Sequence, residues 1–385
     1  WPVVLAQVGI MMLGVVDGYN SGIGGGAFLL IRRAKGELVA LDGREMAPAA
    51  ASRDMYLRNG RADTTLSQTG ALASGVPGAL AAYERARRAY GRKPLAELIA
   101  PAAKIAEDGL PITAGYARRI RSASEALQRF PASRAVLFKV DGQPLAEGDV
   151  LKQTDLGRSY RAIARDGIDW FYRGAYAQAV GTWMRDNGGV MTAADFKNYV
   201  VKARTPVSST YRGYTLVGMG PPSSGGVHVA QILNILEHFD LRALDSAGER
   251  QHVIAEAMKL AFADRAHWLG DPDFADVPRG LLDRGYAKTF AARINLDRAT
   301  PVAGHSLPPD AEPRFFEKHT THFSVADAEG NWVACTQTIN TSFGSKVIVP
   351  GTGIFLNNEM DDFSVEPGMP NHFKLIGAEA NAIAP

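Results

Sequence analysis

Residues 317–345, "EKHTTHFSVADAEGNWVACTQTINTSFGS", alternate apolar and polar side chains on both sides of a short turn. This pattern predicts a β-hairpin, because successive side chains of a strand point to opposite faces of a sheet. The turn "DAEGN" fits a three-residue loop with Gly330 in the left-handed conformation, so that Asp327 pairs with Asn331. Counting outward from that pair places Thr320 opposite Thr338, and a β-bulge would shift this register by one residue.

The predicted register sorts the side chains of the hairpin by polarity. One face is apolar and suits a core: Phe323, Val325, Val333, Cys335 and Ile339. The other face carries hydroxyl, imidazole and amide groups: Thr320, His322, Ser324, Thr336, Thr338 and Asn340. This polar face is either an exposed, threonine-rich surface or a site that uses hydroxyl chemistry.

Thr320 begins the hairpin and follows a segment, 295–316, that has no periodicity and four prolines. Such a segment is typical of an extended, exposed linker. If the bond between His319 and Thr320 were cut, Thr320 would carry a hydroxyl nucleophile and an α-amine that titrates at about pH 8. These are the two groups of the N-terminal threonine type of nucleophilic catalysis. We therefore place a functional boundary at His319/Thr320.

The composition is that of a globular protein and excludes several functional classes. The 385 residues are 46% hydrophobic and 21% charged, and their net charge of +2 with scattered basic residues does not indicate nucleic-acid or anionic-membrane binding. The single cysteine, Cys335, excludes an internal disulfide and a thiolate metal cluster, and it is typical of a small core residue. His319 and His322 are spaced to lie on opposite faces of a strand, so we predict that they do not bind a metal together. We also predict no cofactor.

Helical periodicity and strand-like runs recur along the rest of the chain. The apolar run 1–16 has no basic residues before it and no small-residue cleavage site after it, so it predicts a buried helix rather than a signal peptide. The other predicted helices are 77–91, 95–109, 175–189, 227–241 and 246–271. The other predicted strands are 26–33, 37–42 and 214–220.

Two glycine-rich loops differ from nucleotide-binding motifs. The glycines of "SGIGGGAF" (21–28) precede a predicted strand, whereas a dinucleotide-binding fingerprint follows a strand and opens a helix. In "GPPSSGGVH" (220–228), Ser223 and Ser224 are placed either to cap the following helix or to form an anion-binding nest. We favour the cap.

Eight further segments occur in a fixed order around this framework: "SGIGGGAFLL", "ALDGREMAPAAASRDMY", "ASGVPGALAAYE", "GGVMTAADFKNY", "RTPVSSTYRGY", "PPSSGGVHVAQILNILE", "DRAHWLGDPDF" and "GTGIFLNNEMDDFSVEPGMPN". Together with the hairpin they resemble γ-glutamyltransferases (γ-glutamyl transpeptidase, glutathione hydrolase) over most of residues 14–385. The resemblance implies an α+β protein with the αββα fold of N-terminal nucleophile hydrolases, in which two stacked antiparallel sheets lie between helical layers.

The resemblance also implies a precursor that cuts itself between His319 and Thr320 into a heterodimer. Residues 1–319 then resemble the large subunit, and residues 320–385 resemble the N-terminal part of the small subunit. The reaction implied is cleavage of γ-glutamyl amides such as glutathione through an ester on Thr320, followed by transfer to water or to an amino-acid or peptide amine.

The resemblance assigns roles to six residues. Thr320 is the nucleophile, and Thr338 hydrogen-bonds it. Arg44 holds the α-carboxylate of the γ-glutamyl group, for which a guanidinium fork is well suited. The α-ammonium of that group is held by Asn340, Glu359 and Asp362.

The chain departs from the family pattern at both ends. "WPVVLAQVGIMML" fills only part of the usual N-terminal region, and Asp17-Gly18 stand where Glu-Pro is usual. After Pro385 the family has a Ser-Ser pair for the substrate carboxylate and a Gly-Gly pair for the oxyanion hole. We therefore expect a fold incomplete at the C-terminus, and weak or no activity from these 385 residues alone.

Two other functions remain open at this stage. One is a related acylase that acts on glutaryl-cephalosporins or poly-γ-glutamate, although a glutaryl group has no ammonium for Asp362 to pair with. The other is an inactive fragment or pseudoenzyme. The family resemblance further implies export to the periplasm or the medium, and no partner among nucleic acids or membranes is expected.

Overall fold

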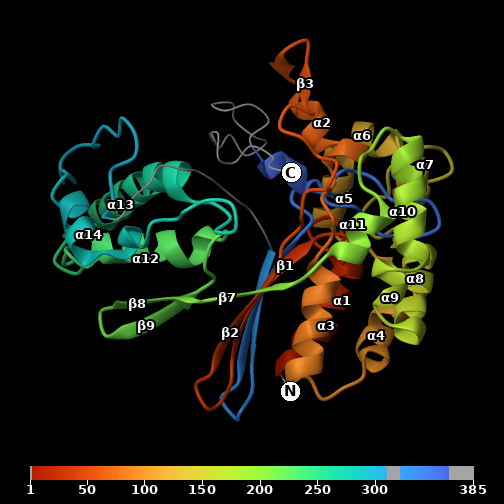
Figure 1. Cartoon of the computed structure of the whole chain (residues 1–385), viewed down its shortest axis with the longest axis horizontal. Coiled ribbons are helices and arrows are strands. Elements are labelled where there is room, and N and C mark those ends of the chain that lie inside the picture. Colours follow the sequence, from red (N-terminus) through yellow and green to blue (C-terminus); the bar gives the residue numbers. More distant parts are fainter. Residues whose placement is uncertain (1, 310–320, 364–385) are drawn as a thin grey trace. The chain divides into compact units, whose positions relative to one another are not determined.

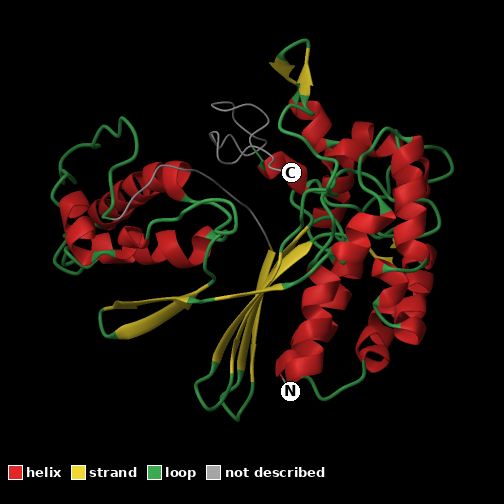
Figure 2. Cartoon of the chain, viewed as in Figure 1, coloured by secondary structure: helices red, strands yellow, loops and turns green. Residues whose placement is uncertain are grey.

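The computed structural model describes residues 2–309 and 321–363, and these fall into two compact units. The first unit contains residues 2–203 and 321–361, and the second contains residues 204–309 and 362–363. Both units combine helices with antiparallel strand pairs, as expected for an α+β protein (Figure 2). The boundary at His319/Thr320 lies outside the described residues and stays a prediction.

A five-stranded sheet is the centre of the first unit, with the strand order β10-β11-β1-β2-β7 (Figure 1). The strands are β10 (Thr321–Ala326), β11 (Trp332–Thr338), β1 (Gly26–Arg32), β2 (Leu38–Gly43) and β7 (Lys202–Arg204). β11 pairs antiparallel with β10 and β1, and β1 pairs antiparallel with β2. The sheet therefore joins the hairpin near the C-terminus to strands from the start of the chain.

The hairpin has the predicted register. Thr321 lies opposite Gln337 and Val325 opposite Val333, and Gly330 has the expected left-handed φ of +85°. The predicted core face is confirmed: Val333, Cys335 and Ile339 are buried, and Phe323 and Val325 are partly buried. The same face also carries Gln337, which is fully buried and which the alternation rule alone did not identify as a core residue.

Helices cover the apolar face of this sheet in successive layers. α1 (Pro2–Val16) packs on β10 and β11, and α3 (Ala79–Tyr90) packs on β1 and β2. α4 (Leu95–Asp108) packs on α1, and α8 (Thr154–Asp166) packs on α4 (Figure 1). The run at the N-terminus is thus a buried helix as predicted, with Ile10, Met11 and Val15 in the core.

The remaining elements of the first unit are shorter. Its other helices are α2 (Thr64–Gln68), η1 (Ala71–Ala73), α5 (Ala114–Ser122), α6 (Ser124–Gln128), α7 (Pro131–Leu137), α9 (Asp169–Tyr172), α10 (Ala175–Asp186) and α11 (Ala193–Asn198). Two small antiparallel pairs are β3 (Leu57–Arg58) with β4 (Arg61–Ala62), and β5 (Leu110–Pro111) with β6 (Val150–Leu151). A 3-10 helix, η3 (Glu359–Asp362), lies near the end of the described chain, and its last residue is assigned to the second unit.

The second unit packs three helices and a β-hairpin around its own core. The helices are α12 (Ser224–Leu236), α13 (Ala247–Trp268) and α14 (Arg284–Ala291), with the 3-10 turn η2 (Arg279–Leu282); the hairpin is β8 (Val207–Tyr211) with β9 (Tyr214–Gly218). α12 contacts both other helices and both strands of the hairpin. Ser223 caps α12 by accepting a hydrogen bond from Gly225 N at 3.1 Å, which confirms the capping role.

The described part of the predicted linker has contacts that the sequence did not indicate. Its described part, 295–309, contains no helix or strand, but it is anchored on α13. Ser306 N donates to Asp264 Oδ1 at 2.8 Å, Trp268 Nε1 donates to Ser306 O at 3.0 Å, and Thr300 N donates to Glu256 Oε2 at 2.9 Å. The described residues are thus irregular and mostly exposed, as predicted, whereas these anchors were not predicted, because local sequence does not reveal partners supplied by a distant helix.

Within the described part of the chain, no helix combines the length and apolarity needed to cross a membrane.

Buried polar side chains join the three helices of the second unit. His228 Nδ1 lies 2.8 Å from Gln231 Oε1, and Gln231 Nε2 donates to Asp264 Oδ2 at 2.7 Å. Tyr286 OH donates to the same Asp264 oxygen at 2.7 Å. His228 is 2% exposed, and burial lowers its pKa to about 3, opposed by the hydrogen bond with Gln231 and reinforced by the charge of Arg265.

We predict that His228 makes the stability of the protein fall in mild acid. In the unfolded chain this histidine is protonated below about pH 6.5, whereas in the folded chain it stays neutral down to about pH 3. The free energy of unfolding should therefore fall, as pH decreases through that window, by up to about 1.4 kcal/mol per pH unit. The free energies of unfolding of the native protein and of His228→Gln, measured in urea between pH 7.5 and pH 4, should become more similar as the pH falls, because glutamine does not titrate. A constant difference across that range would contradict the prediction.

Candidate active site

Four of the five described site residues lie around the open end of β11 in the first unit, and the fifth, Asp362, is assigned to the second unit. Thr338 is the last residue of β11, Asn340 lies in the turn that follows, and Glu359 and Asp362 begin and end η3. Arg44 follows β2, which lies two strands from β11 in the sheet. Thr320 and His319 lie outside the described residues, so the pairing of Thr320 with Thr338 stays a prediction that the register of the neighbouring pairs supports.

The Thr338 side chain is buried and points into the turn after β11. It is 3% exposed, and its Oγ1 accepts a hydrogen bond from Asn340 N at 2.7 Å. Because the oxygen acts as acceptor in this bond, its own proton remains for donation to a further group. This is the property that a threonine needs to hydrogen-bond a neighbouring nucleophile.

Three consecutive glycines before and at the start of β1 allow the backbone to approach the site closely. A Cβ at Gly24 would lie 2.0 Å from Phe355 O, and a Cβ at Gly25 would lie 1.8 Å from Thr338 O. At Gly26 a Cβ would lie 1.9 Å from Glu45 Oε2. The glycine-rich loop therefore serves close packing around Thr338.

Asn340 presents a hydrogen-bond acceptor. It has a left-handed φ of +70°, and its Nδ2 donates to Asn358 O at 2.8 Å. Its Oδ1 is buried and has no hydrogen-bond partner among the described residues. A buried acceptor of this kind suits an N–H donor of a ligand, as the expected contact with an α-ammonium requires.

Arg44 and Glu359 form an ion pair in a largely buried place. Arg44 Nη2 contacts Glu359 Oε1, and the two side chains are 15% and 5% exposed. The Arg44 backbone is fixed on both sides: its N donates to Asp42 Oδ1 at 2.9 Å, and its O accepts from Tyr199 OH at 2.7 Å. The resemblance assigned these two side chains to opposite charges of one substrate group, and the structure places them in direct contact.

The acidic end of η3 is also buried. Asp362 is 7% exposed and Asp361 is fully buried. Asp361 Oδ1 accepts a hydrogen bond from Ser67 Oγ at 2.6 Å, so it acts as a support within the first unit. Asp361 was not among the predicted site residues, although it is adjacent to Asp362.

Two asparagines that sequence reasoning missed hold the site together. Asn357 Nδ2 donates to Gly24 O and to Gly75 O, both at 2.8 Å, and Asn357 Oδ1 accepts from Gly75 N and from Glu359 N. Asn358 Oδ1 accepts from Thr341 N at 2.9 Å. Adjacent amides directly before Glu359, within an otherwise apolar run, were the available signal.

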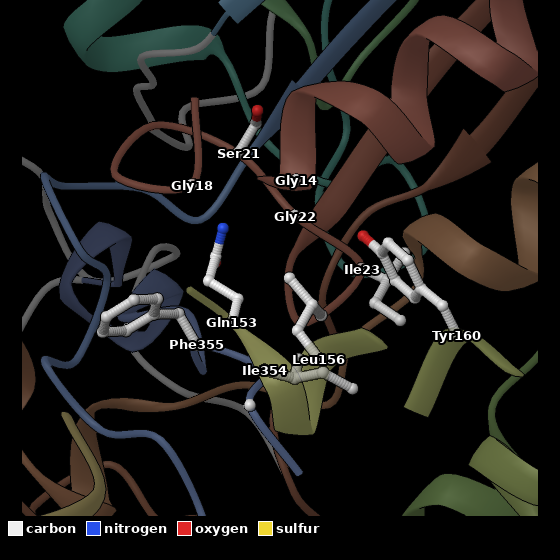
Figure 3. Close-up of a pocket in the computed structure, with 11 residues that line it drawn as sticks. Gly14, Gly18, Ser21, Gly22, Ile23, Gln153, Leu156, Tyr160, Ile354 and Phe355 are labelled. Carbon is white, nitrogen blue, oxygen red and sulfur yellow. The ribbon is translucent and has the colours of Figure 1, made fainter. Parts of the chain in front are cut away.

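A small cavity lies behind the loop that follows α1. Its volume is about 10 Å³, which accommodates about one water molecule. Figure 3 shows its lining from the loop after α1, from α8 and from residues 353–355, with Ser21 and Gln153 among the side chains. The carbonyls of that loop also accept hydrogen bonds from the turn after β11, Phe343 N to Tyr19 O at 2.8 Å and Ile339 N to Asn20 O at 3.2 Å.

Other chemistries find no support in the described residues. Cys335 is fully buried, and burial raises the pKa of its thiol, which suits a core residue and not a nucleophile. Over residues 2–309 and 321–363, no group of three or more histidine, cysteine or acidic side chains is placed to bind a metal ion.

Comparison with known proteins gives one family. The model of the gamma-glutamyltranspeptidase family matches residues 6–385. The chain is 43% identical over 377 residues to a glutathione hydrolase proenzyme of Escherichia coli K12, and the match covers 97% of this chain and 64% of that protein. The chain therefore spans less than two thirds of the length of this relative.

Solved structures agree with the expected fold. The gamma-glutamyltranspeptidase of Helicobacter pylori is similar with a TM-score of 0.75 and 41% identity, covering 78% of this chain and 86% of that chain. A cephalosporin acylase from Bacillus halodurans is similar with a TM-score of 0.84 and 28% identity, covering 100% of this chain and 68% of that chain. The α+β fold of the N-terminal nucleophile hydrolases is thereby confirmed.

We predict that Gly25→Ala disrupts the site and destabilises the first unit. The added methyl would lie 1.8 Å from Thr338 O, a backbone atom that cannot move without shifting β11. The expected loss is at least about 1–3 kcal/mol of unfolding free energy, measured by urea or thermal unfolding. Gly22→Ala is the matched control in the same loop, because a Cβ added there would meet no atom within 4 Å. Equal effects of the two substitutions would show that the close approach at Gly25 is not limiting.

Proposed function

Because the chain belongs to the gamma-glutamyltranspeptidase family, we propose that the protein cleaves γ-glutamyl amides such as glutathione and transfers the γ-glutamyl group to water or to an amine. The observation that carries this proposal is the set of groups around the end of β11. A guanidinium, a buried carboxylate and a buried amide oxygen lie there, on Arg44, Glu359 and Asn340. A γ-glutamyl group carries the complementary α-carboxylate and α-ammonium.

The proposed reaction begins with self-cleavage between His319 and Thr320, which gives a large and a small subunit. The hydroxyl of Thr320 then attacks the γ-carbonyl carbon, while its α-amine takes the hydroxyl proton. Collapse of the tetrahedral intermediate breaks the amide bond, and the α-amine gives its proton to the leaving amine. An ester between Thr320 and the γ-glutamyl group remains. Water or an acceptor amine attacks this ester and regenerates Thr320.

The described residues contribute binding and orientation to this reaction. Arg44 offers two parallel N–H donors to the α-carboxylate. Asn340, Glu359 and Asp362 offer acceptors for the α-ammonium, and Thr338 donates its hydroxyl proton to the oxygen of Thr320. We further propose that the protein is exported to the periplasm or the medium and works as the heterodimer that self-cleavage produces.

A related acylase function is the second candidate, supported by the likeness to the cephalosporin acylase over the whole chain. A glutaryl amide presents a carboxylate to which Arg44 could donate hydrogen bonds, but it lacks the α-ammonium. It would leave the buried acceptor Asn340 Oδ1 without a ligand donor, and an unpaired buried acceptor opposes binding. The amide oxygen and the acids of η3 therefore favour the γ-glutamyl substrate.

We predict that Thr320 is required for both cleavage and turnover. In the intact protein that carries this chain, Thr320→Ala should give one uncut polypeptide and reduce hydrolysis of a γ-glutamyl anilide by at least about 10³-fold, because no other group supplies the nucleophile. Thr321→Ala is the matched control, because strand alternation predicts that neighbouring side chains take opposite faces. It should cut itself and start its small subunit at Thr320, as mass spectrometry of the fragment will show. Normal cutting by Thr320→Ala would contradict the proposal.

We predict that Asp362→Asn separates the two candidate substrates. Removal of the negative charge should lower kcat/KM for a γ-glutamyl anilide by about tenfold or more, because a charge-assisted contact to the ammonium is weakened. The same change should leave kcat/KM for a glutaryl anilide within about threefold, since that substrate has no ammonium. Arg44→Met should lower both values, because both substrates carry the carboxylate. A preference for the glutaryl substrate in the native protein would favour the acylase.

A further inference from the structure

Lys346 lies in the turn that carries Asn340, and the proposed reaction gives it no role. The turn follows β11, and its backbone is left-handed at Asn340 (φ +70°), Phe343 (+63°), Gly344 (+51°) and Lys346 (+71°). A side chain in this conformation is costly, and only glycine adopts it freely. A lysine in this conformation therefore indicates contacts that hold it there.

The Lys346 ammonium closes the turn from the inside. Its Nζ donates to Thr341 Oγ1 at 3.1 Å and to Gly344 O. The backbone is held as well, because Lys346 O accepts from Ser133 Oγ at 2.7 Å. Burial lowers the pKa of Lys346 to about 8, and the Asp361 carboxylate opposes this shift. The ammonium form therefore predominates at pH 7.

A chain of hydrogen bonds runs from Lys346 to Asn340. Thr341 N and Thr341 Oγ1 donate to Asn358 Oδ1 at 2.9 and 3.1 Å. Asn358 O in turn accepts from Asn340 Nδ2 at 2.8 Å. Asn358 is anchored outside the turn, since its Nδ2 donates to Gln68 O at 3.2 Å and its N donates to Ile339 O at 3.2 Å.

We propose that Lys346 is a positioning residue, which closes the turn 340–346 and thereby fixes the Asn340 side chain where it receives the α-ammonium of the γ-glutamyl group. Lys346 acts through Thr341 and Asn358 and does not touch the substrate. The role of Asn340 as a ligand rests on the proposed function, whereas closure of the turn does not. An apolar side chain of the same length would fill this space without the cost of burying a charge, so a space-filling role does not account for the lysine.

Two substitutions at this position test the proposal in different ways. Lys346→Met keeps the length of the side chain and removes its charge and donors. Lys346→Gly removes the side chain and also relieves the left-handed backbone, so we expect it to fold even if the methionine variant does not. Lys104→Met is the control: Lys104 also pairs with an acid, Asp108, but its side chain is 69% exposed on α4.

Three measurements on the intact protein separate positioning from general stability. Amide hydrogen exchange of the peptide covering 339–346 should rise by about tenfold in both Lys346 variants, because each loses charge-assisted hydrogen bonds. KM for a γ-glutamyl anilide should rise by about tenfold, with kcat changed by less than about threefold. The thermal midpoint of Lys346→Gly should stay within a few degrees of the native value, and Lys104→Met should match the native protein in all three measurements.

The outcomes are distinguishable. Native exchange in residues 339–346 of both folded Lys346 variants would overturn closure of the turn. Faster exchange with an unchanged KM would overturn the link to Asn340. If the native protein does not cleave γ-glutamyl anilide, the proposed function fails, and the exchange measurement still decides whether Lys346 closes the turn.

Discussion

The hydrogen bonds of the Asn357 side chain are the interaction on which the site depends. It is fully buried, and its amide makes four hydrogen bonds, to Gly24 O, Gly75 O, Gly75 N and Glu359 N. Four is the full hydrogen-bonding capacity of an amide, so burial leaves none of its groups unpaired. The three partners are far apart in sequence, and one side chain thus joins the loop before β1, the chain before α3 and the start of η3.

Close approach of backbones is the second constraint on the same region. Gly24 and Gly25 lie against the carbonyls of Phe355 and Thr338, where a methyl group would collide. This contact sets β1 beside the end of β11, so that Thr338 emerges next to the turn of Asn340. Glycines at these positions therefore permit the close approach of the two backbones.

Charge compensation governs the part of the site, Arg44 and Glu359, that would bind the charged groups of a substrate. Arg44 and Glu359 are both largely buried and contact each other, and a buried charge is tolerated only when it is paired. Under the proposed function, a γ-glutamyl group brings a carboxylate and an ammonium together and can offer each partner an opposite charge without leaving the other uncompensated. A ligand with only one of these charges cannot do so.

The sequence by itself determined the elements that depend on local pattern. Helical periodicity located α3, α4, α10, α12 and α13, because amphipathic helices repeat their apolar residues within one or two turns. Strand alternation and the "DAEGN" turn predicted the β10–β11 register, and the structure confirms it, with Gly330 in the left-handed conformation that the three-residue loop requires. The motifs also identified the family and the residues Thr338, Arg44, Asn340, Glu359 and Asp362 as a candidate set.

Only the tertiary structure decided how that set is held together. The contact of Arg44 with Glu359, the four bonds of Asn357 and the closure of the turn by Lys346 join residues that no periodicity relates. The anchoring of residues 295–309 on α13, within the predicted exposed linker, has the same origin. Local pattern reports which face of an element is buried, whereas a buried hydrogen bond or ion pair depends on which distant group arrives opposite, and that is set by packing alone.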